Sequence, residues 1–217
     1  MTLAKTISSE QARRFYERLG ARHDLGARFE RRAKARALEH LELRPGLHVL
    51  NVGVGTGKEQ AIIQARILPG GVATGIDLAR TMLQLTRQRT PAPGRSSLCR
   101  GDARTLPFRA AAFDRVFSSY MLDLIPASDI PTVLAEMWRV LRPGGRLVLA
   151  GLTEGVTLPS RALMAAWKTL HRASPYTLGG CRPLRLTHPL LKAGFHEVKR
   201  EVIVQGGMPT EVLHASK

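Results

Sequence analysis

We predict an α/β fold in which a doubly wound, mostly parallel sheet carries an antiparallel closing strand and an N-terminal helical cap. Three features of the sequence support this prediction. Apolar segments of strand length alternate with helical segments from residue 47 onward, a glycine-rich turn follows the first of these strands, and the basic segment 9–42 has a helical pattern. Strands that alternate with helices in this way are typical of parallel sheets.

The segment 9–42 is expected to form the helical cap. Its apolar residues recur with a period near 3.6, and Gly20 and Gly26 interrupt the pattern. We expect two helices that are broken near Gly20–Gly26, with Ser8 or Ser9 as the N-cap of the first. The chain is therefore divided into a helical cap or lid, 1–44, and a single globular domain that contains the sheet, 45–217.

The remaining elements follow in order from residue 47. We predict strands at 47–52, 72–77, 97–100, 113–118 and 146–150, separated by helices at 57–67, 78–89 and 128–141. Glycine and proline mark the turns, for example Pro69-Gly70-Gly71 and Pro143-Gly144-Gly145. The tail is less regular, and its predicted elements are helices at 159–172 and 189–193 and closing strands at 196–204 and 211–215.

Composition indicates one globular unit. The chain has 217 residues, of which 44% are hydrophobic, and no apolar run reaches the roughly 20 residues that span a bilayer. Cys99 and Cys181 have neither metal-binding nor redox spacing, so we expect no metal site and a reducing compartment. The start of the sequence lacks the apolar core of a secretory signal. The expected location is therefore the cytoplasm.

The net charge of +16 is the unusual bulk property. Arginines supply most of it, and they are concentrated in the helical segment at Arg13, Arg14, Arg18, Arg22, Arg28, Arg31, Arg32 and Arg36. A surface this basic attracts nucleic acid, an anionic membrane or an acidic substrate. A basic amphipathic helix can lie on a membrane surface, which would make the protein peripheral. The alternative interpretations are an arginine-rich solvated surface and a helix that only covers the core.

The glycine-rich turn lies in the segment 49–58, VLNVGVGTGK. A strand that runs into such a turn and then into a helix places backbone N–H groups against a nucleotide-like ligand. The glycines Gly53, Gly55 and Gly57 do not fit a dinucleotide fingerprint, because Lys58 occupies the position of its third glycine. A phosphate-binding P-loop is also excluded, because Glu59 follows the lysine in place of Ser or Thr.

Two aspartates end neighbouring strands of the predicted sheet. Asp77, followed by Leu78, lies about 20 residues beyond the turn, where an acidic side chain can bind ribose hydroxyls. Asp102 follows the third strand, and its carboxylate could accept from an adenine amino group while the Ala103 N–H donates to a ring nitrogen. The alternatives are an N-cap of helix 78–89 for Asp77 and an Asx-turn for Asp102.

Together these motifs resemble the class I S-adenosylmethionine-dependent methyltransferases, with their Rossmann-like sheet. The resemblance is greatest to the ubiquinone/menaquinone-biosynthesis methyltransferases and the bacterial phospholipid N-methyltransferases. It covers about residues 10–150 and is specific for the fold and cofactor, not for the acceptor. The motifs that carry it are 49–57, Gly75-Ile76-Asp77, Gly101-Asp102-Ala103 with Leu106-Pro107-Phe108, Phe113-Asp114 and 139–147.

The resemblance implies that S-adenosylmethionine is the cofactor and S-adenosylhomocysteine its product. The three glycines would approach the methionine end, Asp77 would hold the ribose, and Asp102 and Ala103 would hold the adenine. The segment 118–123, which begins with Ser118, would line the sulfonium and the acceptor. Asn51 is a departure, because the family usually has Asp or Glu there; an amide carries no charge, and attraction to the cofactor's ammonium should weaken.

The expected reaction transfers a methyl group to a small, lipophilic acceptor such as a phospholipid headgroup amine or a quinone precursor. Asp123 is the first candidate for a general base, and Tyr120 and His23 follow, with His23 at a position where relatives often carry a lid tyrosine. The segment 153–188 is a candidate apolar wall for the acceptor. The alternatives are an RNA methyltransferase, which the low aromatic content of 5% disfavours, and a protein that binds S-adenosylmethionine without catalysis.

Overall fold

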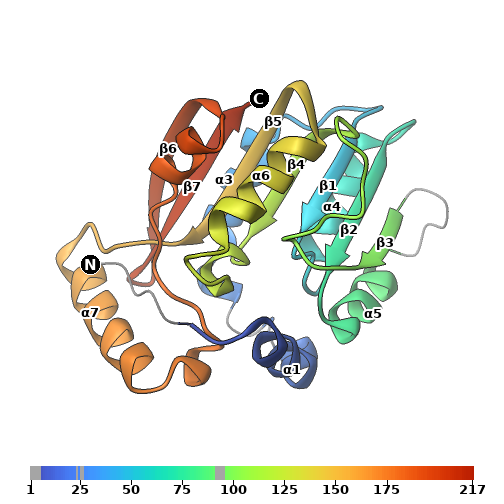
Figure 1. Ribbon diagram of the computed structural model, residues 1–217. Helices are drawn as coiled ribbons and strands as arrows, with labels where there is room; N and C mark the ends of the chain where they lie inside the picture. Colours follow the sequence, from blue (N-terminus) through green and yellow to red (C-terminus); the bar gives the residue numbers. More distant parts are fainter. Residues whose placement is uncertain (1–5, 23, 25–26, 91–95) are drawn as a thin grey trace.

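The computed structural model describes residues 6–22, 24, 27–90 and 96–217, which fold around a seven-stranded sheet (Figure 1). The order of the strands across the sheet is β3-β2-β1-β4-β5-β7-β6. The strands are β1 (His48–Val52), β2 (Val72–Asp77), β3 (Ser96–Arg100), β4 (Phe113–Ser119), β5 (Leu141–Leu152), β6 (His196–Gln205) and β7 (Met208–Ser216). Strands β1 to β5 are parallel, and β7 pairs antiparallel with both β5 and β6. The predicted mostly parallel sheet with an antiparallel closing strand is therefore confirmed.

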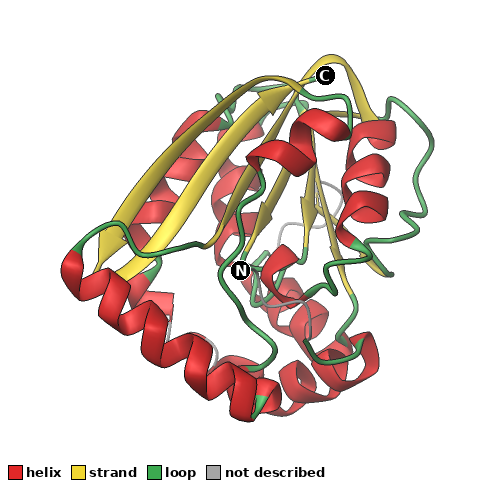
Figure 2. Ribbon diagram, turned by 60° about the vertical axis from the view of Figure 1, so that its left-hand side comes forward, coloured by secondary structure: helices red, strands yellow, loops and turns green. Residues whose placement is uncertain are grey.

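Helices cover both faces of this sheet. The α-helices are α1 (Ser9–Leu19), α3 (Arg31–His40), α4 (Lys58–Ile67), α5 (Arg80–Arg89), α6 (Ile130–Val140), α7 (Leu158–Ala173) and α8 (Thr187–Lys192). Buried residues of α3 and α4 form one hydrophobic cluster with the sheet, and buried residues of α6 and α8 form another. Helices α1 and α7 lie beyond the edge at which the parallel strands end (Figures 1 and 2). That edge is where ligands bind in open α/β sheets.

The side chains of β1 alternate between the two faces. Val49 belongs to the cluster with α3 and α4, whereas Leu50 and Val52 belong to the cluster with α6. Successive side chains of a strand point to opposite faces, so Asn51 shares the face of Val49 and points toward α4. Because Leu50 and Val52 face α6, Asn51 between them must face α4.

The fifth strand is longer than the sequence predicted. It begins at Leu141, which pairs with Phe113, and the regular register resumes where Arg115 pairs with Arg146. The residues between, including Gly144 with a φ of 72°, are an irregularity in the strand. The expected turn at Pro143-Gly144-Gly145 therefore interrupts β5, with residues 142–145 opposite Asp114 alone, and pairing with β4 is present on both sides of it.

The N-terminal helix α1 begins as predicted. Ser8 is its N-cap and forms a capping box with Gln11, in which each side chain accepts from the other residue's backbone N–H. Just before it, Ile7 is buried and the Thr6 hydroxyl donates to the carbonyl of Gly180. These contacts attach the start of α1 to a segment far away in the sequence.

No helix in the described part of the chain is long and apolar enough to span a membrane.

We expect Leu134→Ala to lower the free energy of unfolding by about 2–5 kcal/mol, because it leaves a cavity in the cluster between α6 and the sheet. Leu134 is fully buried. The matched control is Leu191→Ala on α8, whose side chain is exposed and whose loss should cost less than about 1 kcal/mol. Urea unfolding of both variants measures the difference, and equal losses would contradict this assignment of the core.

Candidate active site

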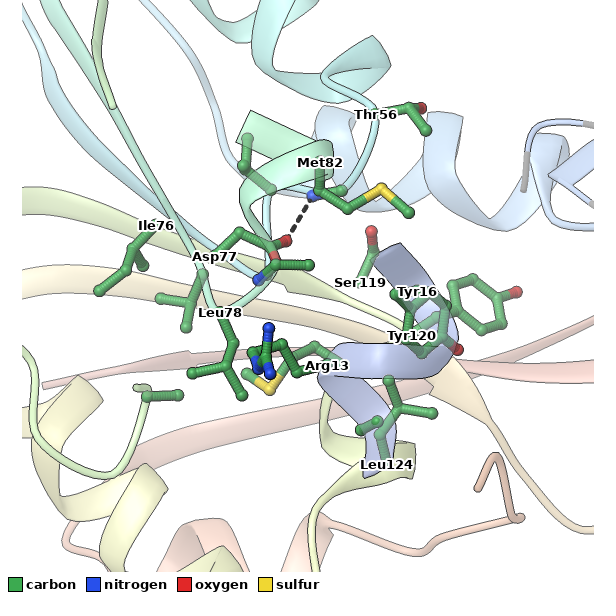
Figure 3. Close-up of a pocket in the computed structure, with 18 of the residues that line it drawn as sticks. Arg13, Tyr16, Thr56, Ile76, Asp77, Leu78, Met82, Ser119, Tyr120 and Leu124 are labelled. Atoms are coloured by element: carbon green, nitrogen blue, oxygen red, sulfur yellow. Dashed lines mark hydrogen bonds between the residues drawn. The ribbon is translucent and has the colours of Figure 1, made fainter. Parts of the chain in front are cut away.

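A deep pocket lies at the carboxyl ends of β1, β2 and β4, under helix α1. Its volume is about 1090 Å³, a figure that includes the open solvent at its mouth. Figure 3 shows side chains of α1, of the end of β2 and of the segment after β4 around one space. The sequence predicted a site at this edge, and this pocket lies there.

The glycine turn forms one wall of the pocket through Gly53 and Gly55, whereas Gly57, which was also expected to contact the cofactor, does not line it. Gly53, Gly55 and Gly57 all have positive φ, at 75°, 57° and 84°. A Cβ atom on Gly53 would lie 2.7 Å from Met121, and one on Gly57 would lie 2.7 Å from the backbone of Thr86. Larger residues would therefore strain the turn and push apart the segments that close around it.

The carboxylate of Asp77 lies at the centre of the pocket wall (Figure 3). One oxygen accepts from the Gly55 N–H at 2.9 Å, and the other accepts from the Ala79 N–H at 2.9 Å. Burial raises the pKa of Asp77, although these backbone donors act in the opposite direction. Leu78 also lines the pocket. The contact with Ala79 is an Asx-type contact before α5; the N-cap of that helix is Ala79, so the predicted alternative, an N-cap at Asp77, is not observed.

Asp102 and Ala103 line the same pocket. Asp102 Oδ1 accepts from the Arg104 backbone N–H at 2.9 Å, which is an Asx-type contact, and Oδ2 accepts from the Arg104 guanidinium at 2.6 Å. These side-chain hydrogen bonds from Arg104 lower the pKa of Asp102. The carboxylate is therefore charged at neutral pH and is held in place by its own neighbour. Both interpretations of Asp102 remain compatible with this geometry.

Asn51 and Ser118 were expected to contact the cofactor directly, but neither is among the residues that line the pocket. The Asn51 amide is 2% exposed and donates to Gln60 Oε1 of α4 at 3.2 Å. The Ser118 hydroxyl donates to the carbonyl of Val52 at 2.8 Å. Each side chain is used for a contact inside the protein, and the next residue of β4, Ser119, lines the pocket.

The three candidate bases lie in different surroundings. Tyr120 lines the pocket, has a φ of 52°, and its hydroxyl lies 2.6 Å from Thr210 Oγ1. Asp123 is 1% exposed and lies behind the wall, where its carboxylate accepts from the Leu152 N–H at 2.7 Å. His23 lies outside the described residues. The geometry therefore favours Tyr120 over Asp123 for contact with a substrate.

The predicted acceptor wall at 153–188 is not observed. None of the described residues that line the pocket comes from this segment. Trp167 instead donates its indole N–H to the carbonyl of Cys181, and Met164 is buried beside a separate cavity on α7. The segment packs on itself through Trp167 and on α1 through an edge-to-face contact between Tyr176 and Phe15. Its apolar residues are therefore not available to line the pocket.

The wall facing Tyr120 comes from the N-terminal cap. Arg13 and Tyr16 of α1 and Lys34 of α3 line the pocket together with Met121 and Leu124. Arg13 Nη1 donates to Glu17 at 2.8 Å, so its charge is partly neutralised. Sequence reasoning missed these residues because helical periodicity shows which residues share a face, but not which part of the sheet that face covers.

Polar contacts attach the cap to the glycine turn. Asp24 Oδ1 accepts from the Thr56 hydroxyl at 2.7 Å, and Oδ2 lies 2.5 Å from Arg89 Nη2 and 3.4 Å from Lys58 Nζ. Burial acts to raise the pKa of Asp24, but the hydrogen bonds from Thr56 and Arg89 outweigh it and lower that pKa. A charged Asp24 therefore joins the cap, α4 and α5 at the rim of the pocket.

Asp123→Asn should change how stability depends on pH. Burial raises the pKa of Asp123 to about 8. The native state thus keeps a proton that the unfolded chain loses, so this group's contribution to stability is lost as pH rises toward 8. As the pH rises from about 5.5 to about 8.5, we expect the free energy of unfolding of the variant to increase by about 3 kcal/mol relative to that of the unmodified protein.

Urea unfolding at both pH values measures this gain. Asp129→Asn is the matched control, because hydrogen bonds from Arg104 and Ser128 lower the pKa of Asp129 and place its titration below this pH range. Its difference from the unmodified protein should therefore not change with pH. Parallel stability curves for Asp123→Asn and the unmodified protein would show that the buried carboxyl is not protonated.

Known proteins resemble this chain in sequence and in fold. A family model described as a methyltransferase domain matches residues 49–145. The malonyl-[acyl-carrier protein] O-methyltransferase of Erwinia pyrifoliae is 31% identical over 80% of this chain and 62% of its own length. The demethylmenaquinone methyltransferase of Staphylococcus aureus is 31% identical over 70% of this chain and 64% of its own length.

Among solved structures, a SAM-dependent methyltransferase from Thermotoga maritima has a TM-score of 0.71 at 19% identity, with 95% of this chain and 99% of that chain covered. It shares the fold. The chain spans less than two thirds of the length of the two curated relatives. The resemblance that the motifs indicated is nevertheless confirmed, because the methyltransferase domain model matches the segment 49–145 that contains most of them.

Proposed function

We propose that this protein transfers a methyl group from S-adenosylmethionine to a small, lipophilic acceptor, such as a phospholipid headgroup amine or a quinone precursor. One observation carries the proposal. A single pocket extends from the glycine turn, Asp77 and Asp102 to a largely apolar end between α1 and the segment after β4. Donor and acceptor could therefore occupy one enclosed space, as a direct transfer requires.

The cofactor end has the groups that a nucleoside with a charged tail needs. The turn around Gly55 allows close approach of the backbone, and the carboxylates of Asp77 and Asp102 lie at the ends of adjacent strands. Apolar side chains, including Leu78 and Met82, lie between and beside them. In this proposal they enclose the adenine, while the carboxylates accept from hydroxyl and amino groups.

The acceptor end is lined by Ala12, Tyr16, Met121, Leu124 and Ile125. These side chains suit an apolar or aromatic molecule more than a nucleic acid, which would need an open, basic groove. The name of the Staphylococcus aureus relative indicates a quinone precursor as that protein's substrate. Both considerations favour a lipophilic acceptor here.

The bound cofactor would supply an electrophilic methyl group on a sulfonium. The protein's own contribution is positioning and exclusion of water by α1, which can provide much of the acceleration in such a displacement. Burial raises the pKa values of Tyr16 and Tyr120 above the usual tyrosine range, so both hydroxyls keep their protons at neutral pH. The acceptor end therefore favours nucleophiles that need little help from a general base.

The cap also presents an exposed basic surface. Arg14, Arg18 and Arg22 are exposed on and just after α1, and Arg31 and Arg32 are exposed at the start of α3. In our proposal this surface holds the protein peripherally at an anionic membrane from which a lipophilic acceptor enters the pocket. The charge would act by long-range attraction that salt screens.

A labelled-methyl assay tests the activity. The purified protein is incubated with methyl-labelled S-adenosylmethionine and, separately, with extracted lipids, quinone precursors and RNA. We expect label in a lipid or quinone fraction. Label in RNA alone would support the nucleic-acid alternative, and binding of the cofactor without transfer to any fraction would favour a non-catalytic binding protein.

Sedimentation with liposomes tests the membrane partner. We expect vesicles with anionic lipid to retain the protein and neutral vesicles to release it. The double variant Arg18→Gln/Arg22→Gln should lose part of this retention, whereas the control Arg185→Gln/Lys192→Gln, with the same charge change at exposed sites elsewhere, should not. Equal retention on both kinds of vesicle would contradict the proposal.

A further inference from the structure

The first strand brings no charge to the cofactor end of the pocket. Asn51 is buried, faces α4 and donates to Gln60 Oε1, and Gln60 Nε2 in turn donates to the Ser96 hydroxyl at 3.3 Å. This chain of amides satisfies the polar atoms of Asn51 inside the protein. The amino-acid end of S-adenosylmethionine has an ammonium group, and a carboxylate for it must come from another element.

A glutamate and a lysine lie on the pocket wall beside the glycine turn. Glu59 is in the first turn of α4, directly after the turn, and Lys34 comes from α3. Both line the pocket, and their side chains are only 14% and 11% exposed. The distance between Lys34 Nζ and Glu59 Oε1 is 3.5 Å. Charged groups of opposite sign thus lie side by side at the end of the pocket where the glycines are.

Lys34 is already paired without Glu59. Its ammonium lies 2.9 Å from Glu30 Oε2, closer than the 3.5 Å to Glu59. Burial alone would lower the pKa of Lys34, but the charges of Glu59 and Glu30 outweigh it and raise that pKa. Two nearly buried carboxylates therefore share one ammonium, which leaves one negative charge in excess. A buried charge without a matching partner is costly, so this arrangement favours a positively charged group of a ligand beside Glu59.

The other lysine near Glu59 does not cancel this excess. Lys58 lies 3.4 Å from Asp24 Oδ2, and its side chain is 44% exposed at the rim. Asp24 is also paired with Arg89 at 2.5 Å. This second set of charges belongs to the contact between the cap and the glycine turn, and water at the rim screens it.

We propose that Glu59 and Lys34 bind the amino-acid end of S-adenosylmethionine, and that Glu59 replaces the acid that is missing at position 51. The ammonium of the ligand pairs with Glu59, and its carboxylate pairs with Lys34. The amino-acid end of the ligand, which is a zwitterion, thereby gives Glu59 a positive partner and Lys34 a negative one where the two side chains are 3.5 Å apart. This inference rests on the proposed function and assigns chain-specific residues to one end of the same pocket.

Two ligands that differ only in the amino-acid part can distinguish a contact of Glu59 with that part from an effect of Glu59 on binding of the whole ligand. S-adenosylhomocysteine has the amino-acid end, and 5′-deoxy-5′-methylthioadenosine lacks it, while neither has a sulfonium. We expect Glu59→Gln to weaken S-adenosylhomocysteine roughly 10- to 100-fold, the usual effect of losing a hydrogen bond to a charged group that is partly buried. Binding of methylthioadenosine should stay within about threefold.

Isothermal titration of both ligands against the same preparation gives the two constants. A variant that is partly unfolded would lose both ligands equally, so the ratio of the two constants reports the assigned contact. Glu39→Gln is the matched control, because it removes the same charge from α3 at an exposed side chain and should change neither constant.

The outcomes are distinct. A loss that is equal for the two ligands, or no loss at all, would overturn the assignment of Glu59 while leaving S-adenosylmethionine binding intact. If the unmodified protein binds neither ligand, the proposed function itself fails, and the assignment fails with it. A selective loss of S-adenosylhomocysteine supports both.

Discussion

The carboxylate of Asp77 is the contact on which the architecture of the site depends. It accepts one backbone N–H from the glycine turn after β1 and another from the segment that opens α5. Burial of a carboxylate is unfavourable, and two backbone donors offset that cost. A single side chain at the end of β2 therefore fixes the spacing of two loops, and the wall formed by these loops is the one the proposed cofactor would contact.

The period-two alternation of the strands decides which polar residues reach this wall. Within β1, Asn51 lies on the same face as Val49 and is used inside the protein, in contact with α4. Ser118 is likewise used between strands. Residues that follow the end of a strand, such as Asp102 and Tyr120, are not bound by the alternation and can turn toward the pocket. One of them, Tyr120, does so with a positive φ, which an ordinary residue adopts only where the surrounding structure enforces it.

Much of the fold was predictable because it depends on local pattern. The alternation of strands and helices, the glycine turn and the N-cap at Ser8 all follow from neighbouring residues. The early start of β5 was not predictable, because Pro143-Gly144-Gly145 has the composition of a turn and only the pairing of Leu141 with Phe113 places it within a strand. The site shows the same division. Asp77 and Asp102 lie at predicted strand ends, whereas Arg13, Tyr16 and Lys34 reach the pocket through the packing of the cap, which sequence periodicity does not specify.

The charges of this protein are arranged on two scales. The excess of 16 positive charges is spread over the surface, and exposed arginines of the cap are part of it. At the pocket wall the sign is locally reversed, because Lys34 is shared by Glu59, which lines the pocket, and by Glu30 behind it. Water and salt screen the surface charges over about 10 Å, but they screen the enclosed group much less. The basic surface can therefore attract an anionic membrane without preventing a positively charged cofactor from entering, and under the proposed function the two binding events would depend differently on ionic strength.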